Sequence, residues 1–198
     1  MKIAVLKTLV FTAALVPVVR LVAGIFTGDL TANPIEYITH QTGWFALAFL
    51  VASLSVTPVR RLTKWHVAIR FRRMLGLFAF FYGTLHLVTW VVLDHFFAFP
   101  EMIKDVVKRP FVTVGMATYL MLLPLALTST TAMIRRLGGK RWNQLHRLAY
   151  VAGITAVTHF WWLVKSDVRE PQRWAVAVAL LLGVRTWWTF QARSSSRS

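Results

Sequence analysis

The segment Trp142-Asn-Gln-Leu-His-Arg-Leu-Ala-Tyr-Val-Ala-Gly-Ile-Thr-Ala-Val-Thr-His-Phe-Trp-Trp162 is long and apolar enough to cross a membrane as a helix. It nevertheless carries two histidines, His146 and His159. An imidazole inside the hydrocarbon is costly and normally has a partner on another helix. At the helical rise of about 1.5 Å per residue, the two rings are roughly 20 Å apart along the axis. They therefore cannot share one ion, and each needs its own partner in the bundle.

The composition places the whole chain in the membrane class. Of 198 residues, 57% are hydrophobic, and the mean hydropathy is +0.56. Cysteine is absent, which excludes disulfides, thiolate-bound iron–sulfur clusters and covalent attachment of a c-type haem. Any cofactor must therefore be held by histidine, by other side chains or by packing.

The distribution of apolar residues predicts an all-α integral membrane protein with six transmembrane helices. We expect spans at about Val5–Phe26, His40–Thr57, Met74–Leu93, Phe111–Leu127, Gln144–Val164 and Trp174–Phe190. The first is longer than the apolar core of a signal peptide and lacks a clear cleavage site, so we expect a retained helix. Residues 1–192 then form one transmembrane domain, followed by a disordered cytoplasmic tail at 193–198.

The charged residues predict the orientation of the chain in the membrane. All seven acidic residues fall in the connections 27–39, 94–110 and 165–173, which hold only six of the 23 basic residues. The positive-inside rule then places both termini in the cytoplasm. The net charge of +16 is explained in this way, and nucleic-acid binding loses its main support.

Two histidines on different spans are expected at the same depth. The third and fifth spans run in the same direction, with His86 roughly 18 Å beyond Met74 and His159 roughly 22 Å beyond Gln144. Two imidazoles from neighbouring helices can bind the iron of a flat macrocycle from opposite sides, which favours electron transfer over oxygen binding. We therefore interpret His86 and His159 as ligands of an outer haem iron.

An inner layer of polar residues is expected near the cytoplasmic face. Arg72 and Arg73 come level with His146, which would either cap a carbonyl or serve an inner haem. On a straight helix, thirteen residues rotate His146 by about 140° from His159, so ligation at both depths requires a helix irregularity or a shifted haem. The two arginines are candidates for an inner ligand or for contacts with haem propionates.

The remaining polar residues of the spans allow several interpretations. His40 begins the second span and could approach the outer haem, shuttle protons, bind a quinone headgroup or have no function. Arg20 and Arg185 lie within spans, where extension to the headgroups is the default and pairing with haem propionates is a hypothesis. His66 and His95 lie in or beside connections, where we expect solvated side chains.

Five short motifs resemble the MsrQ family, the haem-binding membrane subunit of the bacterial periplasmic methionine-sulfoxide reductase system. They are Arg72-Arg-Met-Leu-Gly-Leu-Phe78, Gly83-Thr-Leu-His86, Leu127-Thr-Ser-Thr130, Trp142-Asn-Gln-Leu-His-Arg147 and His159-Phe-Trp161. The resemblance extends from about Asn33 to Arg185. It implies a ferric-reductase-like transmembrane domain with one or two b-type haems and FMN.

The same resemblance implies a path for electrons. They would come from quinol or a cytosolic flavin reductase and pass to a periplasmic molybdopterin-containing subunit that repairs oxidised methionine. It associates His86, His146 and His159 with haem. In relatives with two haem-ligating histidines on both the third and fifth helices, one of those positions corresponds to Arg72 or Arg73 here. The basic stretch Arg60–Arg73 is a candidate surface for a flavin phosphate.

The outer segment Pro100–Arg109 places apolar residues at helical spacing among charges, which predicts a short interfacial helix. We interpret it as a docking surface for the periplasmic enzyme. Two rival functions are a stand-alone ferric-reductase-like oxidoreductase, which needs a nucleotide domain that this chain lacks, and a metal or proton transporter. Transporters usually carry carboxylates within their spans, and here every Asp and Glu lies outside the spans or at their ends.

Overall fold

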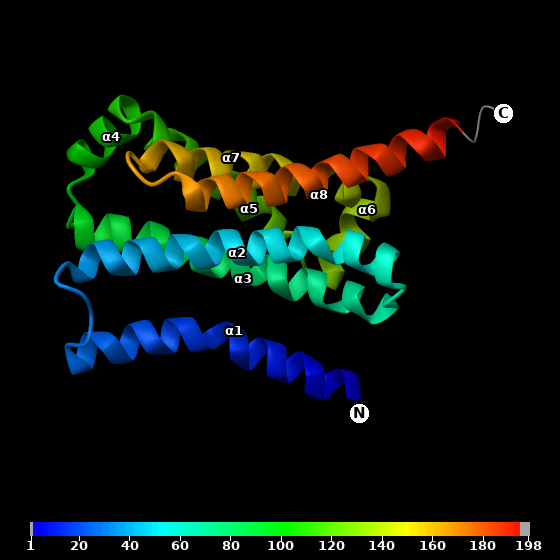
Figure 1. Cartoon of the computed structure of the whole chain (residues 1–198), viewed down its shortest axis with the longest axis horizontal. Coiled ribbons are helices and arrows are strands. Elements are labelled where there is room, and N and C mark those ends of the chain that lie inside the picture. The colour runs from blue at the N-terminus through cyan, green and yellow to red at the C-terminus, as the bar shows by residue number, and fades with distance from the viewer. Residues whose placement is uncertain (1, 195–198) are drawn as a thin grey trace.

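The computed structural model of the chain describes residues 2–194, and these fold as helices joined by short connections (Figure 1). The long helices are α1 (Lys2–Thr27), α2 (Pro34–Thr63), α3 (Ile69–Val88), α5 (Pro110–Leu127), α7 (Leu148–Leu163) and α8 (Arg169–Ser194). Helices α4 (Phe99–Lys108) and α6 (Thr131–Leu145) are shorter, η1 (His66–Ala68) is a 3₁₀ turn, and η2 (Thr89–Asp94) is a π-helical turn that continues α3. The all-α prediction is confirmed. Of the predicted tail, residues 193–194 end α8, and residues 195–198 lie outside the described residues.

Five stretches within the described residues are long and apolar enough to cross a membrane. They are Ile3–Thr27, Pro34–Thr63, His66–Asp94, Pro110–Leu127 and Arg169–Ala192. Helix α7 is different, because its 16 residues measure only about 24 Å at the helical rise. The predicted continuous helix from Gln144 to Val164 is wrong at its start, since the chain turns at His146 and Arg147 between α6 and α7.

Local sequence signals mark where helices begin and end. The side chain of Asn33 accepts a hydrogen bond from the backbone N–H of Glu36, and Pro34 occupies the first position of α2. That helix ends at Lys64, which adopts the left-handed conformation. At the start of α6, the Thr130 hydroxyl accepts from the backbone N–H of Met133.

The bundle is built from two closely packed helix pairs. Helix α2 packs most extensively against α3, and α5 against α7, while α8 lies over α2 and α7 (Figure 1). Leu50, Ala79, Leu122, Leu125 and Ala152 join the two pairs in one buried cluster at the centre. The start of α1 and the end of α8 lie at the end of the bundle opposite α4 (Figure 1).

Helix α1 is attached to the bundle through the hydroxyl of Tyr82. This fully buried side chain donates to the carbonyl of Ala14 at 2.7 Å and accepts from the backbone N–H of Val18 at 3.3 Å. In a regular helix those two backbone groups would bond to each other. The tyrosine hydroxyl therefore contacts both backbone groups of this turn beside Pro17, and a proline inside a helix is one of the recognised causes of a kink.

Candidate functional site

The two histidines expected at one depth lie next to each other. Helix α3 carries His86 and α7 carries His159, and the centroids of their rings are 6.0 Å apart with the ring planes at 80°. The α2–α3 and α5–α7 pairs thus each present one imidazole toward the space between them.

Each imidazole forms a hydrogen bond to a backbone carbonyl of a neighbouring helix. Nδ1 of His86 lies 2.9 Å from the carbonyl oxygen of Thr39, and Nδ1 of His159 lies 2.6 Å from that of Phe111. A carbonyl oxygen only accepts, so both Nδ1 atoms carry the hydrogen and donate it. In the neutral tautomer this leaves Nε2 unprotonated on both rings. Metal-binding histidines show the same arrangement, in which a second partner fixes the tautomer and the ring orientation.

A glycine faces each imidazole from the neighbouring helix. A Cβ atom added at Gly115 would lie 2.7 Å from Nδ1 of His159, and one added at Gly43 would lie 3.1 Å from Nδ1 of His86. Any larger residue at Gly115 would have to displace the ring, and at Gly43 the ring would have to give by a few tenths of an ångström. These two glycines therefore allow the close approach that the hydrogen bonds to Thr39 and Phe111 require.

The rings face a cavity of about 700 Å³. Its deep part is lined by apolar side chains, including Leu50 and Leu122 of the central cluster. Polar groups gather toward the ends of the helices near α4, where Thr39, His40, Gln41, Asp94, Arg109 and Glu170 line it. A mostly apolar cavity of this size with a few convergent polar groups is typical of a cofactor site.

The donor set fits an iron porphyrin. A metal–imidazole bond of about 2 Å on each side, plus roughly 1 Å from each nitrogen to its ring centre, would allow two imidazoles about 6 Å apart to hold the same iron. The observed separation is 6.0 Å. Within residues 2–194 there is no group of three or more His, Cys, Asp or Glu side chains that would hold a bare ion. Two neighbouring imidazoles beside a large, mostly apolar cavity are better suited to a metal that brings further ligands of its own.

His146 lies in the break between α6 and α7. Its Nε2 is 3.2 Å from the hydroxyl of Thr128, and its ring stacks on Trp142 with centroids 3.8 Å apart. The indole N–H of Trp142 donates in turn to the carbonyl of Thr128. The helix is therefore interrupted at His146 and Arg147, before α7 carries the chain on to His159.

The predicted arginines separate into two groups. Arg72 is half-buried and close enough to His146 and Arg185 to interact with both electrostatically. Arg185 donates to the hydroxyl of Tyr150 at 2.7 Å and to the carbonyl of Leu54 at 2.5 Å. By contrast, Arg73 and Arg20 are exposed, and neither lines the cavity.

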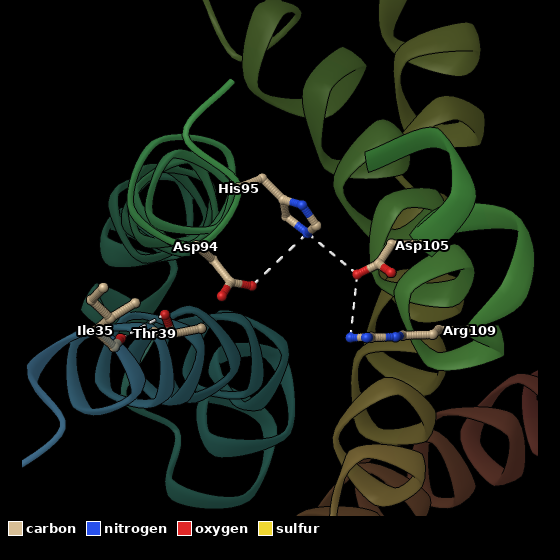
Figure 2. A network of polar contacts seen from close by, with 6 residues as sticks. All are labelled: Ile35, Thr39, Asp94, His95, Asp105 and Arg109. Atoms are coloured by element: carbon tan, nitrogen blue, oxygen red, sulfur yellow. Dashed lines mark hydrogen bonds and ion pairs between the residues drawn. The ribbon is translucent and has the colours of Figure 1, made fainter. Parts of the chain in front are cut away.

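The expectation that His95 is solvated is wrong. Its side chain is 13% exposed, and its Nε2 lies 3.3 Å from Asp105 and 3.9 Å from Asp94 (Figure 2). Its ring also packs against Trp90 with centroids 4.6 Å apart, which the π-helical turn makes possible by redirecting the chain after α3. His66, in contrast, is exposed as expected.

Arg109 is the residue that sequence reasoning missed. It lies between α4 and α5, lines the polar end of the cavity, and forms an ion pair with Asp105 at 3.2 Å. The spacing of Asp105 and Arg109 by four residues was a signal for this pair. Its position at the cavity depends on the packing of α4 and was not available from spacing alone.

Comparison with known proteins identifies the relatives of this chain. Residues 42–157 match the family model described as ferric reductase like transmembrane component. The protein named protein-methionine-sulfoxide reductase heme-binding subunit MsrQ from Herminiimonas arsenicoxydans is 51% identical over 195 residues, covering 98% of this chain and 89% of the relative. Proteins of the same name from Ralstonia nicotianae and Rhodospirillum rubrum are 49% and 50% identical, over 92% and 96% of this chain and 85% and 91% of the relatives. No solved structure matches the chain.

Proposed function

Because this chain belongs to the MsrQ branch of the ferric-reductase-like transmembrane family, we propose that it binds haem between His86 and His159 and carries electrons across the membrane to a methionine-sulfoxide reductase. The observation that carries the proposal is the pair of imidazoles 6.0 Å apart, each with Nδ1 bonded to a carbonyl. Haem held by His86 and His159 would supply single-electron transfer and would leave no open position for oxygen.

The residues of the chain prepare this site in three ways. The carbonyls of Thr39 and Phe111 keep both rings in one tautomer and make the opposite nitrogens more basic, which strengthens them as ligands. The glycines at 43 and 115 leave room for the rings. The apolar deep wall disfavours water, and electrostatic interactions near the site are stronger where the dielectric constant is low.

We assign the inner residues to the entry of electrons. His146, held by Thr128 and Trp142, and Arg72 beside it, form a second polar centre at the other end of the bundle from α4. The candidate occupants of this centre are a second haem, FMN or a quinone headgroup. The candidate electron donors are quinol or a cytosolic flavin reductase. The basic residues of this end suit an anionic cofactor such as FMN.

The proposed orientation puts this basic end in the cytoplasm and α4 on the periplasmic side of a bacterial inner membrane. In this orientation α7 is the sixth span: it is short, and it packs against α5 and α8. α4 is the proposed docking surface for a periplasmic molybdopterin-containing subunit, and its exposed charges are Glu101, Lys104 and Lys108. Replacing them should slow electron delivery and leave the haem spectrum unchanged; an unchanged transfer rate would remove the docking proposal.

One experiment tests the haem assignment directly. The purified protein should show a reduced-minus-oxidised spectrum of low-spin haem, and haem should be quantified per chain. We expect His86→Ala and His159→Ala each to abolish the signal of the outer site. His66→Ala, an exposed histidine, is the matched control and should leave it intact. His146→Ala should retain the outer signal, so complete loss of haem in that variant would refute the division into an outer and an inner centre.

A further inference from the structure

The polar end of the cavity contains a permanently charged basic residue, Arg109. Among the described residues that line the cavity, Arg109 is the only Lys or Arg. The lining includes two carboxylates, Asp94 and Glu170, and Glu170 already accepts a hydrogen bond from the indole N–H of Trp44 at 2.6 Å. An additional carboxylate entering the cavity would be repelled by these two side chains and attracted by Arg109.

The guanidinium of Arg109 is held in place from one side. Its Nη1 lies 3.2 Å from Oδ2 of Asp105, and the same oxygen lies 3.3 Å from Nε2 of His95. Figure 2 shows the side chain extending from the α4–α5 side toward the helices that carry Thr39 and Asp94. A guanidinium has five N–H donors, so the pair with Asp105 leaves others available to a second carboxylate.

Arg109 is also placed close to the imidazole pair along the chain. It immediately precedes α5, two residues before Phe111, whose carbonyl accepts from His159. Most side chains toward the cavity floor are apolar, and an ionised carboxylate is very costly among them. A ligand that places a flat apolar body between the imidazoles must therefore direct its carboxylates toward the end where Arg109 lies.

We infer that Arg109 binds a propionate carboxylate of the haem, and that Asp105 is the positioning residue that orients its guanidinium. The inference rests on the function proposed above, since it requires haem between His86 and His159. It assigns to Arg109 the role that the sequence had suggested for Arg20 and Arg185.

The test compares haem with its dimethyl ester, which keeps the porphyrin and iron and lacks the two negative charges. Apoprotein in detergent is titrated with each compound, and binding is followed by the Soret band. We expect Arg109→Gln to weaken haem binding by about 3- to 10-fold, the range for a half-exposed charge-assisted hydrogen bond, and to leave ester binding unchanged. Lys108→Gln removes the neighbouring exposed charge, which does not line the cavity, and should change neither.

Further variants separate a direct contact from a structural role. Arg109→Lys keeps the positive charge but loses the paired N–H donors of the guanidinium. It should therefore retain part of the preference for haem over the ester that Arg109→Gln loses. Asp105→Asn should reduce that preference less than Arg109→Gln does. Equal weakening of haem and ester by Arg109→Gln would overturn the inference, as would no effect on either. If wild-type protein binds neither compound, the proposed function itself has failed.

Discussion

Gly115 on α5 lies so close to His159 on α7 that a Cβ atom at Gly115 would be 2.7 Å from Nδ1 of the imidazole. Contacts this short between a side-chain carbon and a ring nitrogen require one of the two groups to move. The ring of His159 is held by its hydrogen bond to Phe111, which lies one helical turn before Gly115 on the same helix. The glycine and the carbonyl together determine where this imidazole lies.

We expect Gly115→Ala to displace His159 and to remove most of the bound haem. Gly43→Ala should cause a smaller loss, because its added Cβ would lie 3.1 Å from the ring of His86. Gly183→Ala is the matched control, since nothing lies within 4 Å of a Cβ there and alanine favours a helix by about 1 kcal/mol. Haem per chain measures the effect. Full haem content in Gly115→Ala would contradict the described packing of His159.

The hydrogen bonds between the Tyr82 hydroxyl and α1 predict that removing this hydroxyl lowers the stability of the protein and leaves the haem site intact. Tyr82→Phe removes the hydroxyl that contacts Ala14 and Val18, and we expect it to lower the free energy of unfolding by about 1–3 kcal/mol. Tyr37→Phe is a suitable control, because the Tyr37 hydroxyl has no hydrogen bond to any residue that the structure describes. Thermal unfolding in detergent gives the difference in Tm. Equal Tm values for the two variants would show that these hydrogen bonds contribute no stability.

The sequence predicted five of the apolar spans that the structure shows, and also the proximity of His86 and His159, because hydropathy and the helical rise carry that information. It did not predict the turn at His146 and Arg147. No Gly or Pro marks the turn, and the contact between His146 and Thr128 that accompanies it is tertiary. The π-helical turn after α3 also has no local signal.

His95 and Arg109 show a second limit of sequence reasoning. Both lie in a connection rich in charges, where solvation is the reasonable expectation. Their shared contact is Asp105: the pair with Arg109 is local, whereas the contact with His95 joins α4 to the turn that follows α3 (Figure 2). A spacing of four residues indicated the pair with Arg109 but said nothing about the cavity beneath it.

Arg185 and Arg20 should respond differently to the same substitution. Arg185→Gln removes hydrogen bonds to Tyr150 and to the carbonyl of Leu54, so we expect a loss of about 1–3 kcal/mol of stability with the haem spectrum unchanged. Arg20→Gln, at an exposed position on α1, should change neither quantity. Thermal unfolding and haem quantification together measure both effects. A loss of haem in Arg20→Gln would restore its assignment as a propionate partner.

The proposed orientation predicts which lysines face the periplasm. Lys104 on α4 and Lys140 on α6 are both exposed, and they lie in segments that the positive-inside rule places on opposite sides of the membrane. Because the chain contains no cysteine, Lys104→Cys and Lys140→Cys each introduce a single thiol. In cells with a permeable outer membrane and an intact inner membrane, an impermeant maleimide should label only the thiol at position 104. After the inner membrane is disrupted, both should be labelled equally, which controls for reactivity. Labelling of position 140 alone in intact cells would reverse the orientation, and with it the direction of electron flow proposed for the haem site.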